Sequence, residues 1–188
     1  MTIIKQEYVT PKTWTTAEYH RLIEIGVLSS EDKIELLDGQ IVEMSPAGNY
    51  HAACIDYIGP YLERIIGEEY WIRRQNPILL ANNSEPEPDL AIVKYRKDYY
   101  AHAHPGPEDI LLLIEVADTS LAKDRHVKST LYAEAGIPEY WIMNTEEDLL
   151  EQFIYPENGR YKQQRIYTKQ ELLESPFLPA LEINSLWL

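Results

Sequence analysis

The sequence predicts an α/β domain with a mixed central sheet flanked by helices, and three patterns indicate it. Residues 110–116 form a nearly continuous apolar run, which is typical of a buried central strand. A helical pattern over 118–135 connects that run to another strand at 139–143, and the three segments read as a β-α-β unit. A hairpin comes earlier in the chain, because Asp38-Gly39 favours the tight turn between two short apolar segments.

The N-terminal half should contain two helices. Thr15 offers an N-cap for a short helix that Gly26 ends, and a longer helix is expected over 50–66 with a kink at Pro60. The remaining expected elements are strands at 34–37, 40–44, 70–74, 77–80 and 90–93, a C-terminal hairpin of strands 149–155 and 160–167, and a short helix at 168–173.

The length and composition fit one domain that spans residues 1–188. The chain has 188 residues, of which 45% are hydrophobic and 26% charged, enough to bury a sizeable core. Its longest apolar run ends at Glu115 and is far shorter than the roughly 20 residues of a membrane span, and residues 1–14 lack the apolar core of a signal peptide. We therefore expect a cytoplasmic protein with no membrane partner. Cys54 is the only cysteine, which excludes an internal disulfide and predicts a small core residue.

The charge balance limits the ways in which the chain could contact nucleic acid. A formal net charge of -14 argues against a protein that coats nucleic acid without specificity, because phosphate binding depends on neutralisation by Lys and Arg. A local basic strip can still coexist with an acidic remainder. The candidates for such a strip are Arg73, Arg74, Lys94, Arg96, Lys97, Lys123, Arg125 and Lys128.

Three carboxylates lie in or beside expected strands. Asp89 begins one apolar strand and Glu115 lies near the end of the next. Glu35 stands between two apolar residues of the first hairpin, so alternation places it on the opposite face from them. A lone buried carboxylate is costly, and a divalent cation such as magnesium is a natural partner for oxygen ligands. The alternative is that these acids face solvent or pair with arginine.

Lys128 is the candidate cation of the same site. On a helix it shares one face with Asp124 and Tyr132 at i, i+4 spacing, beside an apolar stripe that contains Val127. A lysine at the edge of the buried side can orient an attacking water or stabilise negative charge at phosphorus. The alternative is a surface ion pair between Asp124 and Lys128.

The order of these residues resembles a known nuclease signature. Pro88-Asp89 followed by Glu115-Val116 is similar to the PD-(D/E)xK pattern, although the lysine of that pattern would fall at Ala117. The longer series resembles the Uma family of restriction-endonuclease-like proteins from about Thr13 to the C-terminus. Its segments are 34–46, His51, 87–91, 114–116, Asp124, Lys128, Tyr132 and 136–141. In that family the lysine is displaced onto the following helix, which matches Lys128.

The resemblance implies a restriction-endonuclease-like core that hydrolyses DNA phosphodiester bonds with Mg²⁺ or Mn²⁺. Glu35, Asp89 and Glu115 would be the metal ligands or their immediate support, and Lys128 the catalytic base-like or electrostatic residue. His51, Gln75 and Arg125 are the candidates for substrate contact. By analogy with restriction-like enzymes, a homodimer is expected.

Two other functions fit parts of the sequence. A binding or assembly module of the same fold, with little or no cleavage, would suit the acidic net charge. A glycosidase working with two carboxylates would leave Lys128 without a necessary role.

Overall fold

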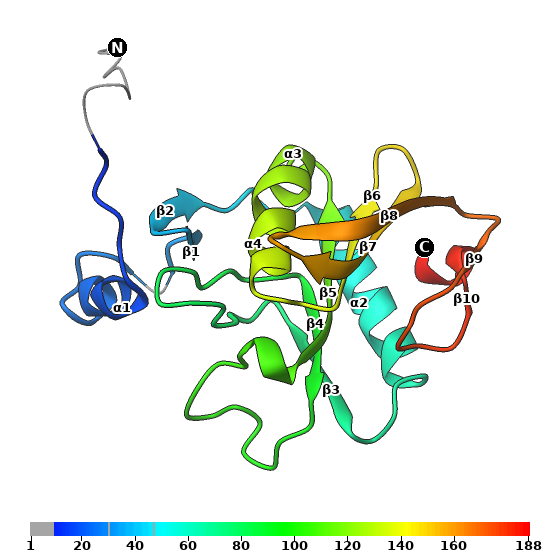
Figure 1. Cartoon of the computed structure of the whole chain (residues 1–188), viewed down its shortest axis with the longest axis horizontal. Coiled ribbons are helices and arrows are strands. Elements are labelled where there is room, and N and C mark those ends of the chain that lie inside the picture. Colours follow the sequence, from blue (N-terminus) through cyan, green and yellow to red (C-terminus); the bar gives the residue numbers. More distant parts are fainter. Residues whose placement is uncertain (1–9, 30, 47) are drawn as a thin grey trace.

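The computed structural model describes residues 10–29, 31–46 and 48–188. Its centre is a six-stranded mixed sheet in the order β3-β4-β5-β6-β7-β8 (Figure 1). The strands are β3 (Tyr70–Arg74), β4 (Leu90–Lys94), β5 (Ile110–Ala117), β6 (Glu139–Asn144), β7 (Leu149–Glu157) and β8 (Arg160–Thr168). Only β5 and β6 run parallel, and every other neighbouring pair is antiparallel. The sheet confirms the α/β class, and the β-α-β unit supplies its one parallel pair.

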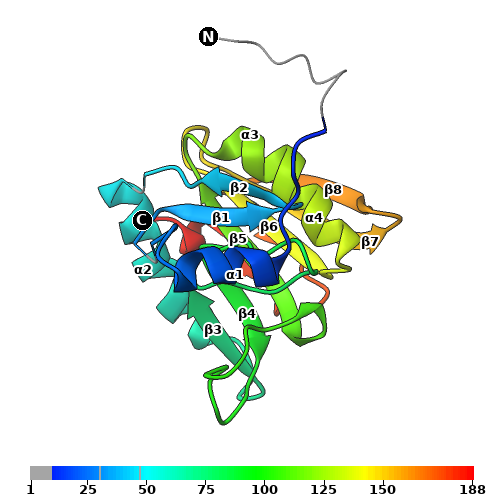
Figure 2. The ribbon, with the colours of Figure 1, turned by 90° about the vertical axis from the view of Figure 1, so that its left-hand side faces the viewer.

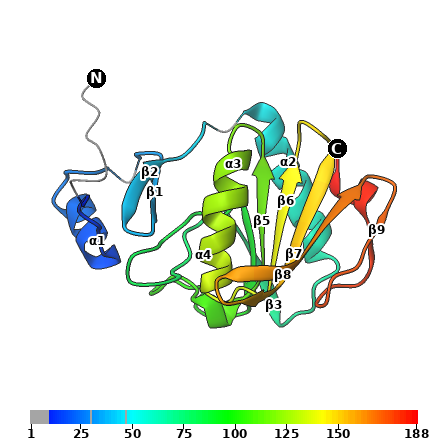
Figure 3. The ribbon, with the colours of Figure 1, turned by 45° about the horizontal axis from the view of Figure 1, so that its top comes forward.

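Helices cover both faces of this sheet. The helix α2 (Asn49–Glu63) packs on one face, where Ile58 and Leu62 meet Ile114 of β5. The other face carries α3 (Leu121–Lys123) and α4 (Ser129–Glu134), and there Tyr132 packs against Leu113. Figure 3 shows α2 and the α3–α4 segment on opposite sides of β5. Alternation along β5 therefore divides the core into two layers.

The segment between α3 and α4 differs from the regular helix that the sequence predicts. Residues Asp124–Lys128 form a π-helical turn. Val127, expected in the buried stripe, is 42% exposed, whereas Lys128 is only 3% exposed. A π-helical turn contains one more residue than an α-helical turn and changes which side chains face inward. The expectation for Val127 was therefore wrong, and Lys128 is fully inside rather than at the edge.

The N-terminal elements lie beside the α3–α4 face (Figure 2). They comprise α1 (Thr16–Glu24) and the hairpin of β1 (Ile34–Leu37) and β2 (Gln40–Glu43). The α1 helix begins at a capping box of Thr15 and Glu18, as the N-cap prediction requires. Asp38 and Gly39 both have positive φ, 45° and 72°, which is the geometry expected of a tight hairpin turn.

Two smaller expectations were wrong. Residues 77–80 form no strand. Ile78 and Leu80 donate their backbone N–H groups to Pro86 and Ser84, whereas Leu79, between them, donates to Pro105 on a second segment. These few hydrogen bonds to two segments do not form a continuous ladder with either one.

Residues 168–173 also form no helix. The Glu171 carboxylate accepts hydrogen bonds from the N–H and the hydroxyl of Thr168, at 2.7 and 2.8 Å, and closes a turn. The chain then enters β9 (Leu172–Leu173), which pairs with β10 (Leu181–Glu182).

Three further expectations concern the burial of the cysteine, membrane spans and a signal peptide. Cys54 is buried in the core against the sheet, as predicted. Within the described residues, no helix has the length and apolar character needed to cross a membrane. The expectation that no signal peptide is present rests largely on residues 1–9, which lie outside the described residues.

Candidate active site

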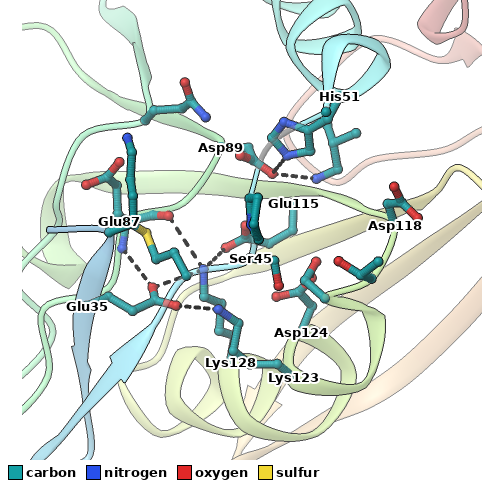
Figure 4. Close-up of a pocket in the computed structure, with 18 residues that line it drawn as sticks. Glu35, Ser45, His51, Glu87, Asp89, Glu115, Asp118, Lys123, Asp124 and Lys128 are labelled. Carbon is teal, nitrogen blue, oxygen red and sulfur yellow. Dashed lines mark hydrogen bonds and ion pairs between the residues drawn. The ribbon is translucent and has the colours of Figure 1, made fainter.

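A pocket opens where the first hairpin, the ends of β4 and β5, α2 and the π-helical turn meet (Figure 4). Its volume is about 130 Å³. The lining residues are Lys33, Glu35, Met44, Ser45, Pro46, Gly48, His51, Gln75, Glu87, Asp89, Glu115, Val116, Asp118, Thr119, Ser120, Lys123, Asp124 and Lys128. The pocket thus contains every residue predicted from the sequence to serve the site except Arg125.

Asp89 and Glu115 point to the same face of the sheet. In β5, Glu115 alternates with Ile114 and Val116, which belong to the core layer beneath α2. Asp89 precedes Leu90, which pairs with Ile114 across the β4–β5 ladder. The two carboxylates therefore stand side by side on the α3–α4 face, at one end of two adjacent strands.

One oxygen of Asp89 is fixed by two donors. Asp89 Oδ2 accepts a hydrogen bond from the backbone N–H of Val116 at 2.8 Å and lies 3.0 Å from His51 Nε2. The hydrogen bond to Asp89 raises the pKa of His51, although burial opposes this, so His51 is the donor. Asp89 Oδ1 accepts no hydrogen bond from the described residues. This oxygen is available to a ligand in the pocket.

Glu115 is buried against Lys128 and Tyr132. Its Oε1 atom accepts hydrogen bonds from Lys128 Nζ and from the Tyr132 hydroxyl, both at 2.9 Å. Burial raises the pKa of Glu115 well above its ordinary value. Glu115 Oε2 accepts no hydrogen bond from the described part of the chain. Asp89 and Glu115 thus each offer one uncommitted carboxylate oxygen to the pocket.

Lys128 bridges two carboxylates. Its ammonium group lies 2.9 Å from Glu115 Oε1 and 3.2 Å from Glu35 Oε2. Burial acts to lower the pKa of Lys128, but the charges of Glu115 and Glu35 outweigh it and raise the pKa above its ordinary value. Lys128 is therefore a permanently charged donor at neutral pH.

Glu35 is occupied by basic groups. Its Oε1 atom lies 2.7 Å from Lys123 Nζ, while Oε2 contacts Lys128 and accepts the Glu87 N–H at 3.2 Å. Burial acts to raise the pKa of Glu35, but Lys128 and Lys123 outweigh it and lower the pKa below its ordinary value. Both carboxylate oxygens of Glu35 are therefore engaged by Lys123, Lys128 and the Glu87 N–H, and neither is free for a ligand in the pocket.

The structure separates the three substrate-contact candidates. His51 and Gln75 line the pocket, and Gln75 sits directly after β3 with a φ of 47°. Arg125 does not line it. Its guanidinium binds Glu151 of β7, with Nε 2.8 and 3.1 Å from the two carboxylate oxygens.

Several lining residues had no role assigned from the sequence. Asp124 is 1% exposed, and its Oδ1 atom is buried with no partner among the described residues, while Oδ2 accepts the Ser120 hydroxyl at 2.6 Å. The i, i+4 spacing between Asp124 and Lys128 was a sequence signal for it. Lys123 had no such signal, because its partner Glu35 lies on a distant hairpin.

The donor set fits a magnesium-like ion. The pocket lining contains six carboxylates but only three lysines, which leaves an excess of negative charge. Within residues 10–29, 31–46 and 48–188 no three His, Cys, Asp or Glu side chains form a ready metal cluster. Magnesium does not require one, since it is usually held by one or two carboxylates together with waters and substrate phosphate. The free oxygens of Asp89 and Glu115 match that requirement.

The chain combines a mixed sheet between helices with carboxylates at the ends of adjacent strands and a lysine on the next helix. The family model Uma2, described as "Putative restriction endonuclease", matches residues 16–185, and the chain belongs to this family. The fold and the family together support a nuclease-like function.

A solved structure shares this fold. It is described as a "putative nuclease belonging to DUF820" from Anabaena variabilis, and it superimposes with a TM-score of 0.70 at 13% sequence identity. The match covers 92% of this chain and 97% of that chain. No curated protein matches the sequence.

Proposed function

We propose that this protein is a metal-dependent endonuclease that hydrolyses DNA phosphodiester bonds with Mg²⁺ or Mn²⁺. The observation that carries the proposal is the meeting of Asp89, Glu115 and Lys128 in one pocket, with one free oxygen on each carboxylate. Asp89 Oδ1 and Glu115 Oε2 would hold the ion. When bound, such an ion would coordinate the scissile phosphate, activate a water and offset the negative charge on the leaving oxygen.

Lys128 acts as a charged hydrogen-bond donor in this proposal. A general base must be able to lose its proton near neutral pH, and the raised pKa of Lys128 favours a charged donor over that role. A fixed ammonium beside Glu115 instead stabilises negative charge that develops on the phosphoryl oxygens.

Two residues would position the groups that react. Glu35 accepts from Lys128 and Lys123 and keeps the Lys128 ammonium at the pocket, so we assign it to positioning rather than to the metal. His51 fixes Asp89 Oδ2 and leaves Oδ1 as the free oxygen of this carboxylate. The His51 ring also lines the pocket and would contact a substrate phosphate.

Incubation of the purified chain with supercoiled plasmid and Mg²⁺ or Mn²⁺ tests the proposal, with a structured RNA as a parallel substrate. Asp89→Asn and Lys128→Met should each lower the rate of nicking by about 100-fold or more, the usual loss for one group that stabilises transition-state charge. Asp56→Asn, a change at an exposed carboxylate of α2, is the matched control and should nick like the wild type. Equal nicking by all variants would point to a contaminant and sink the assignment.

One observation favours a second function. The net charge of -14 suits a binding or assembly module better than a protein that must approach a polyanion. A wild-type chain that binds Mn²⁺ but cuts neither plasmid nor RNA would support this module.

The homodimer and the cytoplasmic location remain predictions from the sequence. One pocket can cut one strand at a time, so cleavage of both strands at one position would call for two chains. Sedimentation of the chain with and without DNA measures this directly.

A further inference from the structure

Three aromatic side chains form an exposed patch on β3 and on the loop after β4. This aromatic patch consists of Trp71, Tyr95 and Tyr99, which are 42%, 43% and 52% exposed. The rings of Trp71 and Tyr99 lie 5.0 Å apart, and those of Tyr95 and Tyr99 lie 5.8 Å apart, both in edge-to-face contact. Large apolar side chains gathered on a surface mark binding sites more often than single exposed ones do.

Basic side chains surround the aromatic patch. Arg73 and Arg96 both lie over the ring of Tyr100, with their guanidinium carbons 5.6 and 4.6 Å from its centre. Arg96 pairs with Asp98. Arg73 forms no ion pair with any carboxylate of the described residues, and its Nε atom is buried without a partner. In a chain with a net charge of -14, an arginine without an acidic partner is a notable site for an anion.

The backbone beneath the patch adopts an uncommon conformation. Tyr99 and Tyr100 have φ values of 50° and 61°. Two successive bulky residues in the left-handed region are rare outside functional positions, because each carries a steric cost that the surrounding structure must offset. The conformation places the Tyr99 ring against Trp71 and buries Tyr100 under the two arginines.

The patch and the pocket lie on the same face of the sheet. Trp71 and Arg73 pair with Val93 and Ala91, which face the α3–α4 layer as Asp89 does. β3 begins beside the patch and ends at Arg74, directly before Gln75, which lines the pocket. Val93 lies four residues after Asp89, which corresponds to about 13 Å along an extended strand. Figures 1 and 2 show β3 and the loop after β4 extending away from α3 at one end of the molecule.

We propose that the aromatic patch and Arg73 bind unpaired nucleotides of the same nucleic acid whose phosphodiester enters the pocket. This proposal rests on the proposed nuclease function and specifies its substrate as one with a single-stranded segment beside the cut. Exposed aromatic rings stack on bases of any sequence, and a neighbouring arginine neutralises the backbone phosphate. The Arg73 guanidinium, which has no acidic partner among the described residues, and the shared face favour nucleic acid over a protein partner as the occupant.

Fluorescence anisotropy of a labelled single-stranded oligothymidylate measures the binding, with the full chain in EDTA so that no bond is cut. Trp71→Ala should raise Kd by about 5-fold to 150-fold, the range expected for loss of one stacked base. Trp71→Phe keeps a ring and should recover most of the affinity. Arg73→Met should lower the slope of log K against log salt by about 0.7, the value for one phosphate of a single strand.

Two variants guard against misfolding and nonspecific effects. Tyr99→Gly removes the ring but suits the left-handed backbone, so it should weaken binding without loss of thermal stability. Tyr57→Ala is the matched control, because Tyr57 is also 42% exposed but belongs to α2 on the opposite face. Its Kd should equal that of the wild type.

The outcomes separate this proposal from the nuclease assignment. If Trp71→Ala and Tyr99→Gly bind as tightly as Tyr57→Ala, the aromatic patch has been misassigned, whether or not Asp89→Asn abolishes nicking. If Trp71→Ala changes only the concentration dependence of the molecular mass, the patch is a protein interface and the proposal falls. A blunt hairpin duplex that binds as tightly as oligothymidylate, with equal loss in Trp71→Ala, would also overturn the preference for unpaired nucleotides.

Discussion

Lys128 Nζ lies 2.9 Å from Glu115 Oε1, although the two side chains come from different elements and both are almost completely buried. The same ammonium lies 3.2 Å from Glu35 of the first hairpin. One cation therefore joins the sheet, the helix and the N-terminal hairpin at the pocket. Its removal should affect both stability and the proposed chemistry.

Lys128→Met should lower the free energy of unfolding by about 3–5 kcal/mol in EDTA, because it leaves buried carboxylates without their counter-charge. Urea unfolding followed by circular dichroism measures the change. Lys123→Met is the control, since the Lys123 side chain is 24% exposed and Glu35 keeps Lys128. A loss in Lys123→Met as large as that in Lys128→Met would contradict the central position given to Lys128.

The Glu35 ion pairs should make stability depend on pH in one direction. The pKa of Glu35 is lowered in the folded chain below its ordinary 4.5, against the effect of burial, by Lys128 and Lys123. A lowered carboxyl pKa contributes stability above the unfolded value, and that contribution is lost as the pH falls through the folded value. Wild type should therefore exceed Glu35→Gln in stability at about pH 7, and the difference should shrink toward about pH 3.

Urea unfolding of both proteins across this range measures the difference. Glu43→Gln, at an exposed carboxylate of the same hairpin, serves as the control and should track the wild type. A gap between wild type and Glu35→Gln that stays constant or widens on acidification would show that Glu35 is not held as a charged partner of the lysines.

The strands that carry Asp89 and Glu115 were predictable because the signal is local. Each carboxylate interrupts or begins an apolar run, and period-two alternation then fixes its face. Asp38-Gly39 likewise specified its hairpin turn from two residues. Lys128 was found from its spacing to Asp124 and Tyr132 and from the family pattern, and all three side chains are buried.

The parts that the sequence did not predict depend on contacts between distant segments. Lys123 meets Glu35 across 88 residues, and no periodicity records such a pair. The π-helical turn at Asp124–Lys128 exposes Val127 in place of the expected apolar stripe. Arg125 carries the same charge whether it faces substrate or Glu151, so only the packing of β7 against the helix determines its direction.

Bound metal should stabilise the fold through Asp89 and Glu115. An ion that binds only the folded chain contributes about 2.7 kcal/mol at 100 times its Kd, which raises Tm by about 5–11 °C for a chain of this size. Thermal unfolding with increasing Mn²⁺ should show this rise in the wild type and in Asp56→Asn.

Variants at the pocket separate metal ligands from positioning groups. Asp89→Asn should lose the Mn²⁺ shift, because its Oδ1 oxygen is a proposed ligand. Glu35→Gln should keep most of it, since the oxygens of Glu35 are already engaged by lysines. Loss of the shift in Glu35→Gln with retention in Asp89→Asn would reverse the two roles.

Arg125 should contribute more to the stability of the fold than to substrate binding. Its guanidinium binds both oxygens of Glu151, which is 1% exposed, so Arg125→Met leaves a buried carboxylate without its counter-charge. The expected loss is about 1–3 kcal/mol of unfolding free energy, the range for an unsatisfied buried group at a partly exposed pair. The double variant Arg125→Met, Glu151→Leu removes both charges and should recover part of that loss. If instead Arg125→Met unfolds like the wild type but binds oligothymidylate more weakly, the guanidinium leaves Glu151 to meet nucleic acid, and the pairing seen in the fold is only its resting position.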